Sequence, residues 1–243
     1  MNRNLILIIL IILFVITTYN SNIKERARKL ANKPSDKVYL IPNFLDDEIF
    51  LDVQNLIEKD YDENKKLYYR SQNYMRSGCS RSHVQAKKTN LEKVFKLIKN
   101  SNTLNKIQNE AKLNLQFVPG TDPNQISVLI YDKENDGIDW HYDSSEYHGN
   151  RWSAILIISN QGYNTKYSSS SFMYKANQKT VSLKGMENNL LLFQGNRIKH
   201  KISKLLKGEK RIVISMVLCD ICTPSLSILS LIKQKFINFF FYG

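Results

Sequence analysis

The stretch QISVLIYDKENDGIDWHYDSSEYHGNRWSAILIIS, residues 125–159, decides the fold. Two runs rich in Val, Ile and Leu enclose a polar centre, and the pair Asp136-Gly137 marks a turn within it. Short β-branched runs separated by turn residues are typical of strands in an antiparallel sheet. The stretch therefore predicts β-structure, with His141 and Asp143 at the end of a short strand.

Similar short apolar runs continue to residue 220, and helical patterns precede them. Residues 38–61 predict a short strand and then a helix, and residues 90–113 predict a second helix with a break near residues 100–102. Residues 62–88 are polar and predict a loop-rich insertion with at most short strands. The remaining strands are expected in SSFMYK, KTVSL, NLLLFQ, HKIS and RIVISMVL. The order predicts a mainly β fold with flanking helices, as a sandwich or barrel with helices on one face.

The 243 residues suffice for one domain, which we expect over residues 37–220. Residues 1–20 contain twelve unbroken apolar residues and predict a signal anchor or transmembrane segment, because no small-residue cleavage site follows. Residues 21–36 are polar and predict a linker. Residues 221–243 are strongly apolar and predict a C-terminal helix that packs on the domain or lies in a membrane interface.

The formal charge of +13 favours acidic partners such as anionic lipid, acidic polypeptide or nucleic acid, although a lysine-rich solvated surface would give the same count. Three cysteines are too few for a disulfide framework. Cys219 and Cys222 have the spacing of a redox or metal pair, but they follow an apolar run. We therefore expect two buried thiols at a strand end, with a disulfide as the alternative in a lumenal domain.

The metal-binding candidates are His141, Asp143 and His200. Alternate residues of a strand point to the same face, so His141 and Asp143 can converge on one ion. His200 lies near the start of a later strand, which a rolled antiparallel sheet can bring alongside. Two histidines and one carboxylate leave coordination positions open, as in Fe(II) oxygenases. His148 with Glu146 offers a different metal set, but its spacing is that of a surface loop.

Two basic residues follow the distal histidine, His200, along the sequence. Lys210 lies ten residues after His200, and Arg211 comes next. A cation on a strand that runs back beside the metal can hold an acidic cosubstrate through a charge-assisted hydrogen bond. The two side chains point to opposite faces of one strand, so only one of them can have this role.

Several ordered motifs resemble the 2-oxoglutarate/Fe(II) dioxygenases of the prolyl 4-hydroxylase-like branch. They run from about Ile41 to Asp220 and are IPNFLDDE, IYDKENDGIDWHYD, RWSAILIISN and LKGMENNLLLFQGNRIKHKISKLLKGEKRIVISM. The resemblance implies a double-stranded β-helix (a jelly roll, or cupin-like fold), Fe(II), 2-oxoglutarate as cosubstrate and commonly ascorbate. It implies His141, Asp143 and His200 as the iron ligands.

The resemblance also implies contacts to 2-oxoglutarate. Lys210 has the spacing of the family's basic residue, whereas Arg211 lies in a strand that resembles the arginine-bearing strand of relatives. We prefer Lys210 and keep Arg211 as the alternative. Tyr131 resembles a tyrosine that contacts the cosubstrate.

The expected activity is hydroxylation of a prolyl or lysyl residue of a polypeptide, with release of succinate and CO2. Two alternatives are a membrane-anchored binding or scaffold protein on the same fold, and an oxidative demethylase of nucleic acid. An anchored domain makes nucleic acid an improbable partner. The anchor predicts a single-pass membrane location, on either the endoplasmic reticulum lumenal side or the cytoplasmic face, and the basic residues 24–29 favour the latter.

Overall fold

Three long strands form the larger layer of the molecule: β5 (Ile126–Tyr131), β7 (Arg151–Gln161) and β12 (Lys210–Cys219). β12 lies between the other two and is antiparallel to both. β-branched and aliphatic side chains dominate all three strands, and such residues favour a pleated, half-buried surface. The computed structural model describes residues 22–27 and 30–224.

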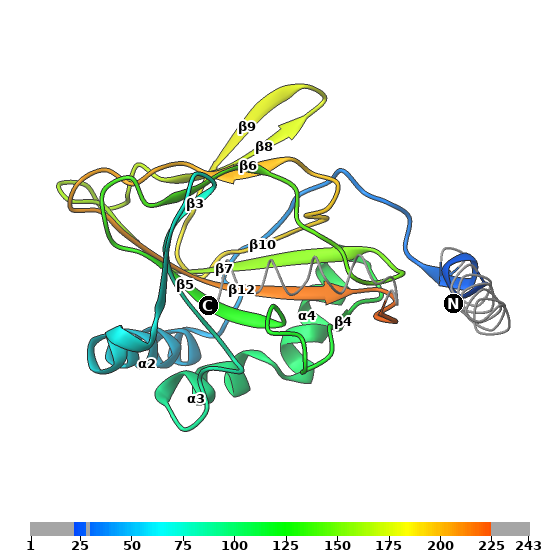
Figure 1. Cartoon of the computed structure of the whole chain (residues 1–243), viewed down its shortest axis with the longest axis horizontal. Helices are drawn as coiled ribbons and strands as arrows, with labels where there is room; N and C mark the ends of the chain where they lie inside the picture. The colour runs from blue at the N-terminus through cyan, green and yellow to red at the C-terminus, as the bar shows by residue number, and fades with distance from the viewer. Residues whose placement is uncertain (1–21, 28–29, 225–243) are drawn as a thin grey trace, which may run out of the picture.

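The sheet continues from this layer into a smaller one that lies across from it (Figure 1). β3 connects them, because it pairs with β6 at its start and with β5 at its end. The order of strands is β1-β10-β7-β12-β5-β3-β6-β11-β8-β9. The other elements are β1 (Tyr39–Ile41), α2 (Asp47–Asn64), a 3-10 turn η1 (Lys65–Leu67), β2 (Tyr69–Gln72), β3 (Arg76–Ser82), α3 (Asn90–Ile98), α4 (Ser101–Ala111), β4 (Gln116–Phe117), β6 (Gly137–His141), β8 (Ser171–Ala176), β9 (Lys179–Lys184), β10 (Leu190–Phe193) and β11 (His200–Ile202).

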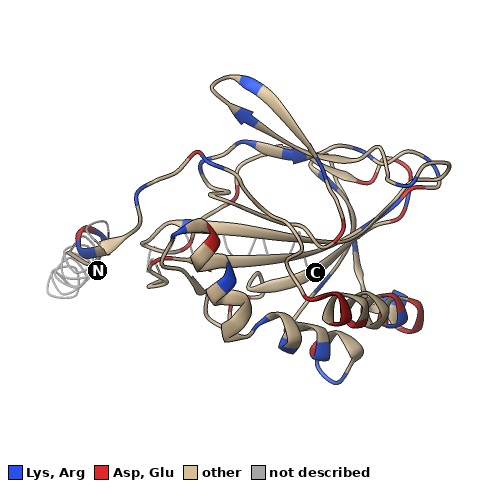
Figure 2. Cartoon of the chain, turned by 180° about the vertical axis from the view of Figure 1, so that it is seen from behind, with Lys and Arg blue, Asp and Glu red and all other residues tan. Residues whose placement is uncertain are grey.

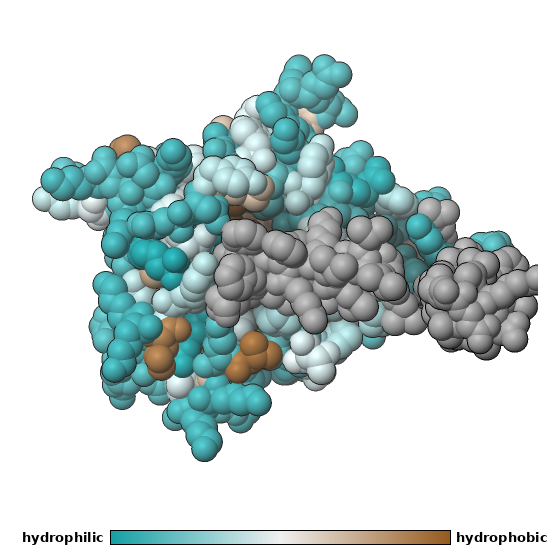
Figure 3. All heavy atoms as spheres, viewed as in Figure 1, coloured by the Kyte–Doolittle hydropathy of each residue, from teal (hydrophilic) through white to brown (hydrophobic). Residues whose placement is uncertain are grey.

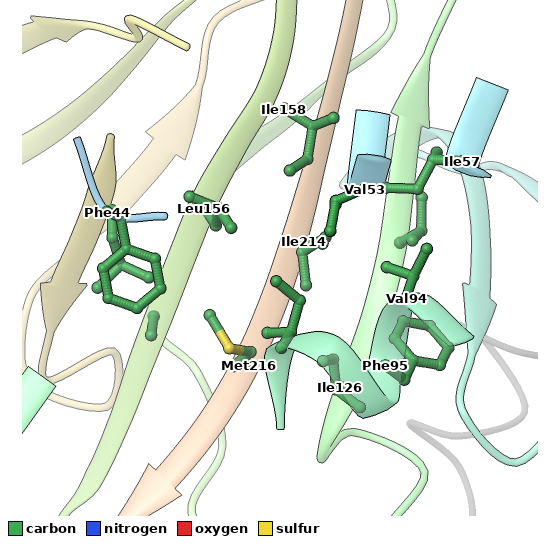
Figure 4. Close-up of a cluster of buried hydrophobic side chains, with 14 of the residues drawn as sticks. Phe44, Val53, Ile57, Val94, Phe95, Ile126, Leu156, Ile158, Ile214 and Met216 are labelled. Carbon is green, nitrogen blue, oxygen red and sulfur yellow. The ribbon is translucent and has the colours of Figure 1, made fainter. Parts of the chain in front are cut away.

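The two faces of the larger layer have different neighbours. Ile214 and Met216 of β12 point to the helices, where they pack with Val53 of α2 and Phe95 of α3 (Figure 4). Each fully buried aliphatic side chain of this kind contributes about 1.5–3 kcal/mol. The alternate residues, which include Val213, face the smaller layer across the interior of the roll.

These observations agree with the mainly β, jelly-roll-like fold and flanking helices expected from the sequence. One detail of the insertion at residues 62–88 differs from expectation. Its short strand β2 agrees with the prediction of at most short strands, but β3, with which β2 forms a hairpin, is a seven-residue strand inside the sheet. The predicted helix over residues 90–113 does break, into α3 and α4.

The terminal segments concern the expected membrane anchor, linker and C-terminal helix. Among the described residues, no helix has the length and apolarity needed to cross a membrane. The expected anchor at residues 1–20 and most of the expected C-terminal helix lie outside the described residues. Residues 22–27 of the expected linker are helical, and the Asn32 amide donates a hydrogen bond to Asp220 (2.8 Å).

Cys219 and Cys222 form a disulfide, so the expectation of two buried thiols was wrong. Cys219 ends β12, and the chain then turns back towards the loop after Asp143. There the backbone amides of His148 and Gly149 donate to the carbonyls of Thr223 and Ile221, at 3.0 and 3.1 Å.

Candidate metal centre

Three side chains from the smaller layer converge at one point inside the roll. His141 and His200 are directly opposed residues on the antiparallel strands β6 and β11, and their ring centroids lie 4.2 Å apart. Asp143 Oδ1 lies 3.6 Å from His141 Nε2 and 3.8 Å from His200 Nε2. All three ligand atoms lie within 4.8 Å of one another, which is a suitable spacing for a single ion between them.

Backbone carbonyls orient both imidazoles. Nδ1 of His141 lies 2.7 Å from the Asp139 carbonyl oxygen, and Nδ1 of His200 lies 2.8 Å from that of Ile198. A carbonyl can only accept, so each Nδ1 carries the proton and each Nε2 keeps a lone pair directed at the shared point. This arrangement fixes the tautomer of a metal-binding histidine.

The charge state of these three side chains also suits a bound cation. Burial would raise the pKa of Asp143, but the charge of Arg151 and the two histidines outweigh burial and hold that pKa well below its usual range. Burial lowers the pKa of His200. Burial also acts to lower the pKa of His141, but the hydrogen bond and charge of Asp143 raise it overall.

Two neighbours hold the Asp143 carboxylate in place. Ser153 Oγ on β7 donates a hydrogen bond to Oδ2, and the Asp143 amide donates to the carbonyl of Gly195 (2.9 Å). A side chain at position 195 would overlap the Asp143 carboxylate itself, so only glycine allows this approach. Serine and glycine residues with these roles carry no recognisable motif, and sequence reasoning missed both.

The donor set fits a hard or borderline divalent ion with open coordination positions, as in non-haem Fe(II) sites. In residues 22–27 and 30–224, no other cluster of three or more His, Cys, Asp or Glu side chains has this spacing. His148 and Glu146 therefore do not form the alternative set, and His83 instead lies 2.9 Å from the Gly120 carbonyl oxygen through Nε2.

A cavity of about 430 Å³ separates the two layers and contains the triad on its wall. Apolar side chains from both layers line much of it, including Ile138, Ile155, Phe172 and Phe193. Tyr142, which is 56% exposed, lies at its rim. The volume is within the range of small-molecule sites, so a cosubstrate and part of a substrate can fit beside an ion.

Arg211 and Tyr131 also line this cavity, on neighbouring strands. Arg211 is completely buried, and its only described hydrogen bond is a long one from Nη1 to the Ser170 carbonyl oxygen (3.4 Å). The Tyr131 hydroxyl is buried without a partner among the described residues. Burial lowers the pKa of Arg211 to about 10, so the guanidinium stays charged at neutral pH.

Lys210 points to the other face of β12, so the preference for it is corrected. Its Nζ forms an ion pair with Glu58 of α2, 2.5 Å away, outside the cavity. Neighbouring residues of a strand point to opposite faces, so only one of Lys210 and Arg211 can point into the roll. In the structure that residue is Arg211. Two further arginines, Arg76 and Arg151, line the cavity and were not among the predicted site residues.

Comparison with known proteins adds to this geometry. No protein-family model matches the sequence, and a search of curated proteins found no match. Solved structures do match. A prolyl-4-hydroxylase from Pseudomonas putida superposes with a TM-score of 0.54 at 11% identity, over 75% of this chain and 91% of that chain.

Two complexes are similar as well. The prolyl hydroxylase from Trichoplax adhaerens, solved with a peptide fragment of a hypoxia inducible factor oxygen degradation domain, gives a TM-score of 0.57 at 14% identity, over 84% of this chain and 92% of that chain. The epimerase SnoN, solved with Fe3+, alpha ketoglutarate and nogalamycin RO, gives 0.57 at 10% identity, over 84% of each chain. The chain therefore has the fold of the 2-oxoglutarate/Fe(II) oxygenases, including prolyl hydroxylases, as the sequence motifs implied.

Proposed function

We propose that this protein is an Fe(II)- and 2-oxoglutarate-dependent dioxygenase that hydroxylates its substrate and releases succinate and CO2. One observation carries the proposal. A two-histidine, one-carboxylate triad and a buried, charged arginine, Arg211, line the same cavity in a fold that such oxygenases share.

In this account each side chain has a defined task. His141, Asp143 and His200 would hold the iron, while Ser153 and Gly195 keep the Asp143 carboxylate in position. Arg211 would bind the distal carboxylate of 2-oxoglutarate through charge-assisted hydrogen bonds, and the Tyr131 hydroxyl would donate to the same group.

Iron held by these residues would supply the activation of dioxygen and the oxidation of the cosubstrate, with ascorbate as the reductant that would maintain Fe(II). The protein's part is to orient and to shield. Phe172 and Phe193 pack around His200, with ring centroids 5.7 and 4.7 Å from the imidazole, so they exclude water from this side of the triad.

For the substrate we propose a prolyl or lysyl residue of a polypeptide. The prolyl hydroxylases among the similar structures support this, and one of them is solved with a peptide. The exposed Tyr142 at the cavity rim offers an aromatic surface for an extended chain.

A membrane location through residues 1–20, on either face, remains part of the proposal.

The test is Fe(II)-dependent formation of succinate from 2-oxoglutarate by the purified full-length protein. We expect turnover in the wild type and its loss in His141→Ala and His200→Ala, each of which removes one ligand. His148→Ala is the matched control, because His148 lies outside the triad and should keep wild-type activity. Equal turnover in all four proteins would refute the proposal, and metal binding without turnover in the wild type would favour a scaffold role.

A peptide library then addresses the substrate. Mass spectrometry should detect the gain of one oxygen atom on peptides that contain proline or lysine, in the wild type and not in His200→Ala. Hydroxylation confined to other residues would overturn the assignment of the substrate while leaving the iron chemistry intact.

A further inference from the structure

The Cys219–Cys222 disulfide closes a turn at the end of β12, and it has no task in the proposed function. The two cysteines are three positions apart in the sequence. A disulfide that closes so short a loop removes little conformational entropy from the unfolded chain, so it stabilises the fold less than a long-range disulfide would. Its main effect is therefore local, on the conformation of residues 219–222.

The turn that the disulfide closes is paired with the loop that follows the metal ligand Asp143. The backbone contacts are hydrogen bonds from the His148 amide to the Thr223 carbonyl (3.0 Å) and from the Gly149 amide to the Ile221 carbonyl (3.1 Å), and an antiparallel bridge between Tyr147 and Pro224. Two segments that are distant in sequence thus hold each other in place at this point.

Asp220, which lies between the two cysteines, is the centre of this contact. Its carboxylate accepts hydrogen bonds from the backbone amide and the side-chain amide of Asn150, both at 2.7 Å, and from the Asn32 amide at 2.8 Å. Gly149 approaches so closely that a methyl group there would lie 2.3 Å from Oδ1 of Asp220. The position of the loop therefore depends on the conformation of the turn that the disulfide closes.

The metal centre lies at the other end of this loop. Residues 144–150 connect the ligand Asp143 to Arg151, the first residue of β7. The Arg151 guanidinium donates a hydrogen bond to the Ser144 carbonyl, and Arg151 and Ser144 both line the cavity. Movement of the loop would therefore reach a metal ligand and part of the cavity wall.

We propose that Cys219–Cys222 is a redox site, and that its reduction by a dithiol releases residues 144–150 and weakens metal binding at the triad. The inference deepens the proposed function, because it concerns control of the same metal centre and rests on that function for its metal readout.

The chemical step is thiol–disulfide exchange. A thiolate of the dithiol attacks Sγ of Cys222, which is partly exposed, whereas Cys219 is completely buried. The Cys219 thiolate leaves and takes a proton, and the second thiolate of the reductant then displaces Cys222 from the mixed disulfide. The cysteine pair gains two electrons and two protons, and the reductant becomes a disulfide.

The first measurement is hydrogen exchange followed by mass spectrometry, on the full-length protein before and after reduction with dithiothreitol. Iodoacetamide trapping of a parallel sample reports whether both cysteines become reduced while the protein stays folded. On reduction we expect exchange over residues 144–150 to accelerate on the order of tenfold, because their hydrogen bonds to the turn open locally. Residues 153–159 of β7 are the internal control and should keep their rate.

The second measurement is calorimetric titration with Mn(II), after the dithiol has been removed by desalting under argon. Reduction should raise the dissociation constant on the order of tenfold, at the lower end of the effect of groups that orient a metal ligand. Cys222→Ser cannot form the disulfide, so it should show the raised constant without reductant and should not respond to dithiothreitol.

Cys79→Ser is the matched control, because Cys79 is a free and buried cysteine on β3, and this variant should keep the full response to dithiothreitol. Asp220→Ala keeps both cysteines and removes the carboxylate that holds Asn150. It serves as a second variant if thermal melting shows that Cys222→Ser does not fold, and it should accelerate exchange over residues 144–150 with the disulfide intact.

The inference is overturned if dithiothreitol reduces the disulfide only after the protein unfolds, or if reduction leaves exchange over residues 144–150 unchanged. Faster exchange with an unchanged affinity for Mn(II) would refute the link to the metal centre. In these cases the proposed function stands. If the oxidised wild-type protein does not bind Mn(II), the proposed function fails, and the inferred control of the metal centre fails with it.

Discussion

At the scale of single residues, the metal centre depends on Gly195, which offers no ligand of its own. Its carbonyl accepts the Asp143 amide, and its missing side chain lets the Asp143 carboxylate and Ser153 hydroxyl meet. Groups that orient a ligand in this way commonly affect metal affinity by about 10- to 100-fold.

We therefore predict that Gly195→Ala weakens metal binding by about 10- to 100-fold. Overpacking should also cost about 1–3 kcal/mol in the free energy of unfolding. Gly120→Ala is the control, because a methyl group there would meet only Lys99 Nζ at 3.9 Å. Calorimetric Mn(II) titration and urea denaturation measure both effects, and an unchanged metal affinity in Gly195→Ala would contradict the orienting role.

The sequence predicted the triad but could not show which of Lys210 and Arg211 points into the cavity, for a physical reason. The His-x-Asp spacing and the distant His200 have a clear meaning on paired strands. In β12, however, Val213 and Val217 face the cavity while Ile212 and Ile214 face the helices. Both faces of the strand are apolar, so the pattern did not reveal which of the two cations points inward.

At the scale of elements, a buried ion pair connects α2 to β3, the strand that carries Arg76 and Gly78. Asp60 is completely buried and accepts hydrogen bonds from Arg81 Nη1 and the Tyr68 hydroxyl, both at 2.9 Å. Removal of one partner of such a pair leaves a buried charge unpaired, which costs about 3–5 kcal/mol.

Asp60→Asn should accordingly lower the free energy of unfolding by about 3–5 kcal/mol. The neighbouring Lys59→Gln is the control, because it removes an exposed i,i+4 pair with Glu63 at 3.9 Å and should change stability by less than about 1 kcal/mol. Chemical denaturation of both variants distinguishes them, and similar midpoints would show that the pair does not stabilise the junction.

Elements with clear hydrophobic periodicity were predictable, and β3 was not. The strands from residue 126 to 219 and the helices α2, α3 and α4 follow the patterns expected of them. β3 has the sequence RSGCSRS, which is polar and contains glycine, although most of its residues are buried. Its burial depends on partners that are distant in sequence, namely the Asp60 carboxylate and the Tyr131 ring, so local pattern could not indicate it.

At the scale of the whole molecule, the hydrophobic core and the cavity that contains the triad lie on opposite faces of the larger layer. Lys and Arg occur on the β8–β9 hairpin and elsewhere on the smaller layer, whereas the charged residues of α2 are mostly Asp and Glu (Figure 2). On the face shown in Figure 3, the exposed hydrophobic residues are separated from one another. Solvated lysines and the arginines of the cavity both contribute to the net positive charge, and composition alone could not distinguish them.

The most direct test of the central claim is anomalous diffraction from crystals of the protein grown with Mn(II), with data collected at the manganese absorption edge. The account predicts that the strongest peak lies between Nε2 of His141, Oδ1 of Asp143 and Nε2 of His200. Density for 2-oxoglutarate should extend from that peak towards Arg211 when the cosubstrate is added. The account would be contradicted if no anomalous peak appeared at the triad, or if a stronger peak appeared at His148 or elsewhere.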